Sequence, residues 1–300
     1  MERDTFLYKA RRSLQAAAHK LLPDSFLSKL YSRIVIGKWP DLDDPRTFNE
    51  KIQWMKLYYY PNDPNVIRAT DKLAAREFAA EKGAVSPAPR VLGIWDRADK
   101  IDWDELPEAF MLKCNHGCAY NIAVKDKNAA DKKKISKQLD RWLGEDFGAF
   151  NVELHYSKIM DRRIFCEEYL GDCIEDYKFF CFNGKPQFVY VSSDLIHDRQ
   201  AKMGFFRLNG EKMQMRRDDY EDIGSIELPP FYDAMLADAA KLCKDFPFVR
   251  VDFFIANGKY YFAELTFTPG AGMMPFDPES IDTEWGELLD ISELIEKYGK

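Results

Sequence analysis

The sequence predicts an α+β fold, in which helices come first and antiparallel strands with helices packed on them follow. Three observations support this prediction. Helix signals occupy the chain up to Gly83, whereas runs rich in Val, Ile, Phe and Tyr begin at Phe110. Two Asn-Gly pairs, at residues 183–184 and 257–258, separate neighbouring strand-like runs, as in β-hairpins. The chain has neither a GxGxxG motif nor a P-loop, so a doubly wound nucleotide-binding fold is not indicated.

The first part of the chain contains three predicted helices. Residues 5–21 form a helix with one basic side, which either docks on its own domain, the interpretation we prefer, or lies on an anionic membrane surface. Thr47 and Glu50 make a capping box for the helix of residues 51–60. A further helix spans residues 70–82 and stops at a glycine.

The rest of the chain is predicted to be mostly strand. Residues 110–115 and 121–125 form two strands that flank a polar loop, and a Lys-rich helix follows them. That helix spans residues 126–143. The remaining predicted elements are strands at 163–169, 176–182 and 187–192, a helix at 231–244, strands at 248–255 and 259–267, and a last helix at 284–297.

Composition limits the classes of function. With 300 residues, 46% apolar and 31% charged, the chain is typical of a globular protein with a large core. Its net charge of −7 lacks the basic excess that nucleic-acid binding requires, so we expect no nucleic-acid partner. The six cysteines form no CxxC pair, and neither a signal peptide nor an apolar run of membrane-spanning length occurs. We therefore expect a cytoplasmic protein with reduced thiols.

Charged residues inside the apolar hairpin 248–267 are the main anomaly of the sequence. Alternation places Arg250 and Asp252 on one face of its first strand. A two-residue turn at 257–258 would put Glu264 on the opposite face of the sheet. A three-residue loop, 256–258, would instead bring Arg250 opposite Glu264 and Asp252 diagonal to it. We predict the three-residue loop because it gathers the charges.

Two carboxylates on one patch indicate a metal site. Asp252 and Glu264 would repel each other unless a cation joined them, and hard oxygen ligands of this kind suit Mg²⁺. The loop that follows, 268–272, is rich in glycine and offers backbone donors, which favours a site. The alternative is an exposed hairpin face on which these charges are solvated.

Lysines and a histidine near the loop 116–120 are candidates for binding an anion. Lys113 ends an apolar strand directly before this loop, where an ammonium group is explained by a phosphate. Lys72 is a second candidate cation, or an ordinary lysine of a helix surface. His116 is the histidine we select as a site residue. A zinc site made by Cys114, His116 and Cys118 is disfavoured by their spacing and by the missing fourth ligand.

Two further strands carry paired charges. In the run of Glu167 and Glu168 one carboxylate must point inward, where it can accept a hydrogen bond from an adenine amino group while the Leu170 peptide reads the ring edge. Asp176 and Lys178 share a face, so the carboxylate can bind ribose hydroxyls and the ammonium a phosphate. The alternative is a simple ion pair worth less than about 1 kcal/mol.

Taken together and in order, these motifs resemble a known family. The segments FNEKIQWMKLY, LKCNHG, DYKFFCFNGKP, FPFVRVDFF and FAELTFTPG look like the TupA-like ATP-grasp family, found in teichuronopeptide and surface-polysaccharide gene clusters. The resemblance covers about residues 40 to 275. It implies a nucleotide, ATP, held between two antiparallel-sheet lobes, and a carboxylate that is activated as an acyl phosphate and captured by an amine.

The resemblance also implies roles for most of the candidate residues. Cofactor-binding roles would fall to Lys72 and Lys113 at the phosphates, Glu167 and Leu170 at adenine, and Asp176 at ribose. Lys178 and Arg250 would face the transferring phosphate as catalytic residues, and Lys178 would also bind the cofactor. Two candidates come from the residues themselves: Glu168 for cofactor binding, as the neighbour of Glu167, and His116 for catalysis, from the polar loop. Asp252 and Glu264 would bind Mg²⁺, and Thr266 stands where the superfamily commonly has Asn, so the third ligand would be its hydroxyl or a water. The loop after Lys113 has one glycine, Gly117, and should be stiffer than a glycine-rich cover.

We accordingly predict three regions: a helical N-terminal region (1–65), a small lobe with the phosphate loop (66–170) and a large lobe with the metal site and C-terminal helix (171–300). The predicted function is an ATP-dependent carboxylate–amine ligase acting on a carboxylate of a cell-surface polysaccharide or teichuronopeptide precursor, in peripheral association with envelope biosynthesis. The alternatives are a sugar-directed kinase or glycosyltransferase on the same fold, and a non-catalytic nucleotide-binding scaffold.

Overall fold

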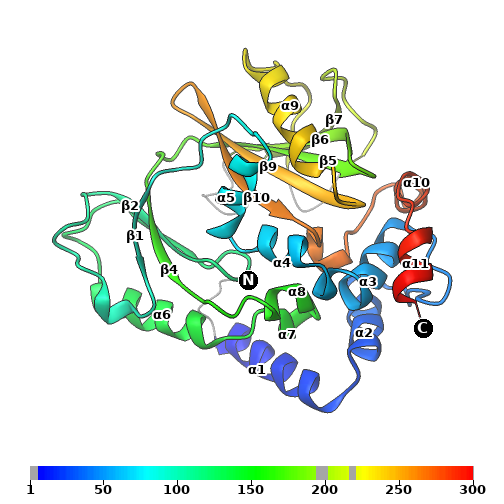
Figure 1. Ribbon diagram of the computed structural model, residues 1–300, viewed down its shortest axis with the longest axis horizontal. Coiled ribbons are helices and arrows are strands. Elements are labelled where there is room, and N and C mark those ends of the chain that lie inside the picture. Colours follow the sequence, from blue (N-terminus) through cyan, green and yellow to red (C-terminus); the bar gives the residue numbers. More distant parts are fainter. Residues whose placement is uncertain (1–5, 194–201, 216–220, 300) are drawn as a thin grey trace.

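The computed structural model describes residues 6–193, 202–215 and 221–299, and it contains two β-sheets with helices packed on them (Figure 1). The smaller sheet has the strand order β1-β4-β2-β3, and the larger has the order β10-β9-β5-β6-β7-β8. Neighbouring strands are antiparallel except for the short β8, which runs parallel to β7 at the edge. The predicted α+β class with two antiparallel sheets is therefore confirmed, with one parallel edge.

The smaller sheet is covered by helices that lie between its strands β3 and β4 in the chain. Its strands are β1 (Val91–Trp95), β2 (Phe110–Cys114), β3 (Asn121–Val124) and β4 (Ile164–Glu168). The sequence prediction omitted β1. Helix α6 (Lys132–Gly144) buries Leu139 and Trp142 against the apolar cluster beneath this sheet, together with residues of the short helices α7 (Gly148–Asn151) and α8 (Leu154–Ser157).

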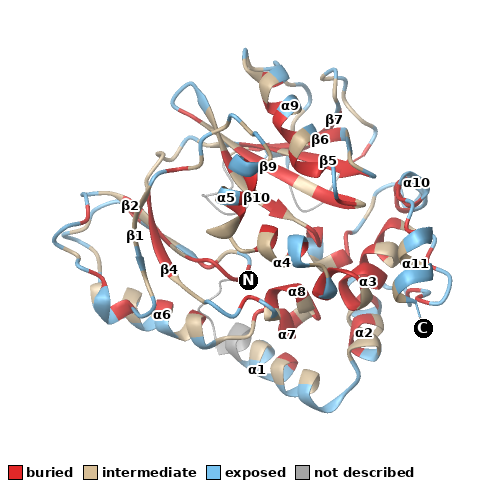
Figure 2. Cartoon of the chain, in the orientation of Figure 1, coloured by how far each residue is buried: buried red, intermediate tan, exposed pale blue. Residues whose placement is uncertain are grey.

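The larger sheet forms the second layer. Its strands are β5 (Glu175–Phe182), β6 (Lys185–Ser193), β7 (Lys202–Arg207), β8 (Glu221–Asp222), β9 (Phe248–Ala256) and β10 (Lys259–Thr266). Helix α9 (Tyr232–Cys243) packs on β5, β6 and β9. Most residues of β4, β5 and β9 are buried (Figure 2), so these strands form the interior of the two sheets.

Helices supply the remaining framework. They are α1 (Phe6–Leu21), α2 (Asp24–Ile36), α3 (Phe48–Tyr58), α4 (Pro64–Thr70), α5 (Ala74–Glu81), α10 (Ser280–Leu288) and α11 (Ser292–Tyr298), with 3₁₀ turns η1 (Tyr60–Asn62), η2 (Ala98–Lys100) and η4 (Pro269–Gly272). The predicted capping box at Thr47 and Glu50 is present at the start of α3. No helix among the described residues is long and apolar enough to cross a membrane.

One predicted helix starts later than expected, and another is divided. The helix expected at residues 70–82 is α5, which starts at Ala74 because the Asp71 side chain accepts hydrogen bonds from the N–H groups of Leu73 and Ala74; α4, which ends at Thr70, was not predicted. The final helix expected at 284–297 is a pair, α10 and α11, separated at residues 289–291. The divisions of the chain at residues 65 and 170 stay predictions.

The hairpin of β9 and β10 differs from the prediction in its turn. Ala256 pairs with Lys259, so the turn has two residues, Asn257 and Gly258, and both have positive φ (52° and 70°), as a type I′ turn requires. The expected three-residue loop is wrong. A β-bulge between Phe262 and Glu264 shifts the register by one residue instead.

The bulge brings the hairpin charges together by another route. Asp252 lies directly opposite Glu264, and Arg250 lies opposite Thr266, instead of Arg250 opposite Glu264. A two-residue turn without the bulge would have paired Asp252 with Ala263 and turned Glu264 to the other face. The extra residue therefore places both carboxylates on one face of the sheet.

Candidate active site

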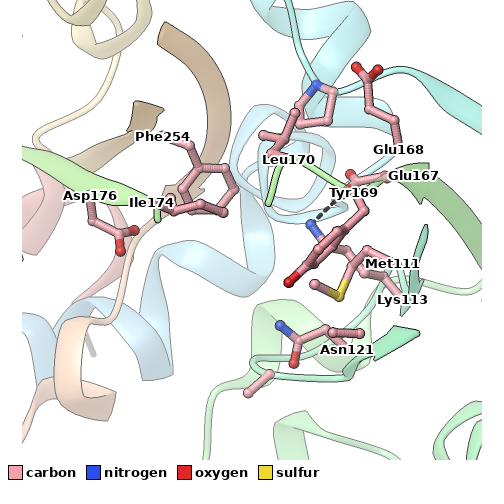
Figure 3. A pocket seen from close by; sticks show the side chains of 13 residues that line it. Met111, Lys113, Asn121, Glu167, Glu168, Tyr169, Leu170, Ile174, Asp176 and Phe254 are labelled. Carbon is pink, nitrogen blue, oxygen red and sulfur yellow. Dashed lines mark ion pairs between the residues drawn. The ribbon is translucent and has the colours of Figure 1, made fainter. Parts of the chain in front are cut away.

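A pocket of about 430 Å³ lies between the two sheets (Figure 3). Tyr169, Leu170 and Ile174, which line it, belong to the segment that links β4 of the smaller sheet to β5 of the larger one. The pocket thus lies where the chain crosses between the sheets. Its other lining residues are Pro89, Met111, Lys113, Ala119, Asn121, Ala123, Glu167, Glu168, Asp176 and Phe254.

Glu167 is the buried acid of this pocket. Its carboxylate forms ion pairs with Lys113 of β2 and Arg76 of α5, and Arg76 also donates to the Pro89 carbonyl at 2.5 Å. Lys113 in turn lies 5.8 Å from the centre of the Phe254 ring on β9, so it contacts both layers. The sequence predicted that one of the two consecutive glutamates points inward, and in the structure the buried one is Glu167.

Glu168 points differently. Its carboxylate accepts a hydrogen bond from the Arg90 N–H at 2.8 Å, and in Figure 3 it is turned away from Lys113. Glu168 therefore lines the pocket wall and secures the chain before β1, while Glu167 offers its buried carboxylate toward the interior.

Asp176 and Lys178 connect the pocket to the charged hairpin. Asp176 lines the pocket and lies 2.5 Å from the Lys178 ammonium, so the ion pair considered as the simpler interpretation does form. Lys178 is opposite Asp252 in the pairing of β5 with β9. The positive charge of Lys178 lies between the pocket and the hairpin carboxylates, and it acts electrostatically on both Asp252 and Glu264.

The hairpin charges form a closely paired cluster with Lys72. The Arg250 guanidinium donates to both oxygens of Asp252, at 2.7 and 2.6 Å, and to the Thr266 hydroxyl at 3.1 Å. Glu264 lies 3.2 Å from the Lys72 ammonium and 3.9 Å from Arg250. Every carboxylate in this cluster therefore has a cationic neighbour.

These neighbours set the ionisation of the cluster. Burial raises the pKa of Glu264, but Lys72 and Arg250 outweigh it and lower that pKa to about 2. For Asp252 burial outweighs the Arg250 cation and raises the pKa above its ordinary value. Burial lowers the pKa of Lys72, yet Glu264 and other anions raise it overall. The mutual repulsion of the carboxylates is thus offset by protein cations, which weakens repulsion as an argument for a metal.

The donor set still fits Mg²⁺. Asp252 and Glu264 face each other across neighbouring strands, with the Thr266 hydroxyl 3.3 Å from Glu264. Among the described residues no group of three or more His, Cys, Asp or Glu side chains is arranged to hold a metal. Mg²⁺ commonly uses one or two carboxylates together with substrate phosphates and water, so a pair of carboxylates is sufficient for an ion that arrives with a nucleotide.

Comparison with known proteins decides the family. The family described as TupA-like ATPgrasp matches residues 50–290. The chain belongs to the TupA-like ATP-grasp family. The resemblance seen in the sequence is therefore confirmed, and with it the ATP-grasp fold. A search of curated proteins gave no match.

Several solved structures are similar in outline to this TupA-like protein. D-alanine–D-alanine ligase from Bacillus anthracis has 18% identity and a TM-score of 0.44, over 77% of this chain and 67% of that one. An L-amino acid ligase from Bacillus licheniformis has 11% identity and a TM-score of 0.42, over 69% and 44%. The ATP-grasp ligase PsnB, complexed with minimal precursor, Mg and ADP, has 16% identity and a TM-score of 0.41, over 80% of this chain and 64% of that one. The TupA-like chain spans about two thirds or less of these proteins.

Lys72 has a second role in the TupA-like site. It lies in the turn between α4 and α5, not within a helix, and its ammonium donates to the Gly117 carbonyl at 2.9 Å as well as pairing with Glu264. Its N–H donates to the Asn115 carbonyl at 3.0 Å. Lys72 therefore joins the loop after β2 to the carboxylates of β10.

His116 lies apart from the pocket, although the Lys72 cation acts on it electrostatically. Its ring is buried, with Nε2 3.0 Å from the Trp142 carbonyl and an edge contact to Tyr120, and it does not line the pocket. Burial, assisted by the Arg162 cation, lowers the pKa of His116 to about 4. The geometry supports a packing role for His116, beneath a loop whose Gly117 also lies tightly against Phe147 and Tyr120.

The glycine-rich loop 268–272 is held by side chains that sequence reasoning missed. The buried Lys56 ammonium donates to the Ala271 carbonyl at 3.0 Å, and Gln53 donates to the Gly272 carbonyl at 2.8 Å. The Thr268 hydroxyl donates to buried Glu153 at 2.5 Å. Burial lowers the pKa of Lys56 to about 8. Both Lys56 and Gln53 lie in the family motif FNEKIQWMKLY, which was the available signal.

Other missed residues line the pocket itself. Phe254 follows Asp252 at the two-residue spacing of a strand face, and Met111 precedes Lys113 at the same spacing, so alternation could have identified both. Arg76 had no comparable signal, because an arginine on a short helix is usually solvent-exposed.

Proposed function

We propose that this TupA-like ATP-grasp protein is an ATP-dependent carboxylate–amine ligase. The observation that carries the proposal is the continuity between the pocket and the charged cluster: Asp176 and Phe254 line the pocket, and Lys178 and Asp252 stand two residues away on the same strand faces. A ligand that fills the pocket would therefore extend toward paired carboxylates and cations. Phosphoryl transfer needs this combination, because it depends on positioning and on neutralising charge.

The proposed nucleotide contacts follow from these positions. Glu167 keeps acceptor capacity beyond its two ion pairs, so it can accept from an adenine amino group beside the Leu170 peptide. Asp176 would bind ribose hydroxyls. Lys113 of β2 and Lys72 of the turn before α5 would bind phosphates.

The proposed chemistry takes place at the hairpin. Bound MgATP supplies the phosphoryl group that converts a carboxylate into an acyl phosphate. Asp252 and Glu264 would hold the metal, and Lys178 and Arg250 would neutralise the charge of the transferred group. Arg250 is already oriented by its two bonds to Asp252, so little reorganisation is needed. We propose an amino acid or similar amine as the nucleophile, a carboxylate of a surface-polysaccharide or teichuronopeptide precursor as its acceptor, and the cytoplasm as the location.

The experiment is a two-stage assay. Calorimetric titration first measures binding of ATP with and without Mg²⁺ to the wild type, to Glu264→Gln and to a control, Glu287→Gln, whose side chain is exposed on α10. We expect Mg²⁺-dependent binding that is lost in Glu264→Gln alone. Uronic acids and short peptides are then tested with amino acids for ADP release, with mass spectrometry of the product.

The products separate the possible functions. An amide together with ADP and phosphate supports the ligase, and hydroxylamine should trap its acyl phosphate as a hydroxamate. A phosphorylated or glycosylated sugar without an amide would assign a kinase or glycosyltransferase instead. Absence of ATP binding under every condition would refute the nucleotide site itself.

A further inference from the structure

The segment of residues 14–39, which includes most of α1 and all of α2, carries most of the exposed large apolar side chains of the described chain. Twelve large apolar residues are exposed in it, and seven of them lie between residues 14 and 39, which indicates a local surface and not scattered exposure. The seven are Leu14, Leu21, Leu22, Phe26, Ile34, Val35 and Trp39.

Helix α1 turns two polar side chains, Arg12 and Gln15, toward the protein. The Arg12 guanidinium lies 3.9 Å from the centre of the Phe150 ring, and the Gln15 amide donates to Asn151 at 3.2 Å. Leu14, which is 72% exposed, and Leu21, which is 81% exposed, lie seven residues apart on the outward side. Ala16 and Ala18 pack against the protein, so among the described side chains of α1 the inward apolar ones are small and the two leucines lie outward.

The apolar surface is concentrated where α1 meets α2. Leu21 and Leu22 precede Pro23, and Phe26 follows in the first turn of α2. Figure 1 shows this corner at the lower edge of the molecule, directed away from both sheets. Ile34, eight residues after Phe26, lies on the same exposed side of α2 and is 69% exposed.

The same segment is basic in an acidic protein. Residues 10–39 contain six Lys or Arg and one Asp, whereas the whole chain has a net charge of −7. The Asp24 carboxylate lies 2.7 Å from a His19 ring nitrogen. Lys20 and Arg33 are exposed beside Leu21 and Ile34. A complementary partner therefore has an apolar interior for the leucines and a negatively charged surface for the basic residues. A membrane rich in anionic lipid has both.

We propose that the α1–α2 corner docks this protein on an anionic membrane surface. Leu21, Leu22 and Phe26 enter the layer between headgroups and acyl chains, and Lys20 and Arg33 lie among the lipid phosphates. From the sequence we preferred docking of the basic helix on its own domain. The exposed apolar residues now favour the alternative, an anionic membrane surface. The proposal is independent of the ligase function, because it uses no residue of the nucleotide site.

The test is co-sedimentation with vesicles. The full chain is mixed with vesicles of phosphatidylcholine alone or with about 30% phosphatidylglycerol. We expect at least about tenfold stronger binding to the anionic vesicles, weakening as salt rises from about 0.1 M to about 1 M. The variant L21S/L22S/F26S should lose at least about tenfold in partitioning, since it removes the inserted apolar area. V85S/I94S/M160S, which removes exposed apolar residues elsewhere, should bind as the wild type does.

A charge pair of variants tests the electrostatic part. K20E/R33E should bind anionic vesicles at least about tenfold more weakly, whereas K133E/K137E, on the exposed side of α6, should bind nearly as the wild type does. Circular dichroism and thermal unfolding establish that each variant is folded. Wild-type binding by both corner variants, or no vesicle binding by the wild type, would overturn the proposal. A concentration-dependent dimer that L21S/L22S/F26S abolishes, without vesicle binding, would assign the surface to a second copy.

Discussion

Replacing Glu264 by Gln and Lys72 by Met, singly and together, isolates the ion pair at the centre of the proposed site. The two charges lie 3.2 Å apart and hold the pKa of Glu264 at about 2, compared with an ordinary value of 4.5. A shift of that size corresponds to about 3 kcal/mol shared between Lys72, Arg250 and Lys178. Because the Glu264 side chain is 32% exposed, solvent screening reduces it, and we expect a coupling energy of about 1 kcal/mol for Glu264 with Lys72.

The measurement is urea unfolding of the four proteins at several pH values. The folded-state pKa of Glu264 is below its unfolded value, so its contribution is complete above about pH 4.5 and is lost as the pH falls toward 2. The coupling energy should decrease over the same interval. As a control, the exposed pair of Lys38 and Glu279 should give about 0.5 kcal/mol or less. A coupling below about 0.3 kcal/mol for Glu264 with Lys72 at pH 7 would refute the pairing.

Three further substitutions test other parts of the site. Arg76→Met leaves buried Glu167 with one cation, so ATP affinity measured by calorimetry should fall about tenfold and the free energy of unfolding by about 2 kcal/mol. Burial lowers the pKa of Lys56, so between about pH 8 and 10.5 the unfolded state binds more protons than the folded state. The unfolding free energy of the wild type should therefore rise by about 3 kcal/mol over this interval, and this rise should be absent in Lys56→Met. His116→Phe should leave turnover unchanged and lower the unfolding free energy by about 1 kcal/mol.

Each of these outcomes has a clear opposite. Unchanged ATP affinity in Arg76→Met would remove Glu167 from the nucleotide site. An equal rise with pH in wild type and Lys56→Met would assign the titration to another group. Loss of turnover in a folded His116→Phe protein would restore the catalytic role that the sequence predicted for this histidine.

Strand periodicity was the strongest signal in the sequence for the site. A two-residue repeat is a local property of the backbone, so it placed Arg250 and Asp252 on one face of β9 without any knowledge of the neighbouring strands. The same rule placed Asp176 and Lys178 together on β5, where they form an ion pair. Neither statement needed the tertiary structure.

The surroundings of Lys72 and His116 were predicted less well. The predicted long helix hid the turn that carries Lys72, because the break is made by the Asp71 side chain competing with the helix backbone. His116 was expected to be a site residue in a polar loop, but Tyr120, Phe147 and Trp142 pack around that loop, and the histidine is buried. A local side-chain contact decided the first case, and packing from later segments of the chain decided the second.

The sequence by itself determined the class of fold, the order of the motifs and the identity of the charged residues, since these follow from local periodicity and residue type. Only the tertiary structure decided how the charges meet. Arg76 reaches Glu167 across 91 residues of sequence, and the bulge before Glu264 sets which carboxylates face each other. Register and long-range pairing are fixed by the packing of whole sheets and helices, which no local sequence pattern specifies.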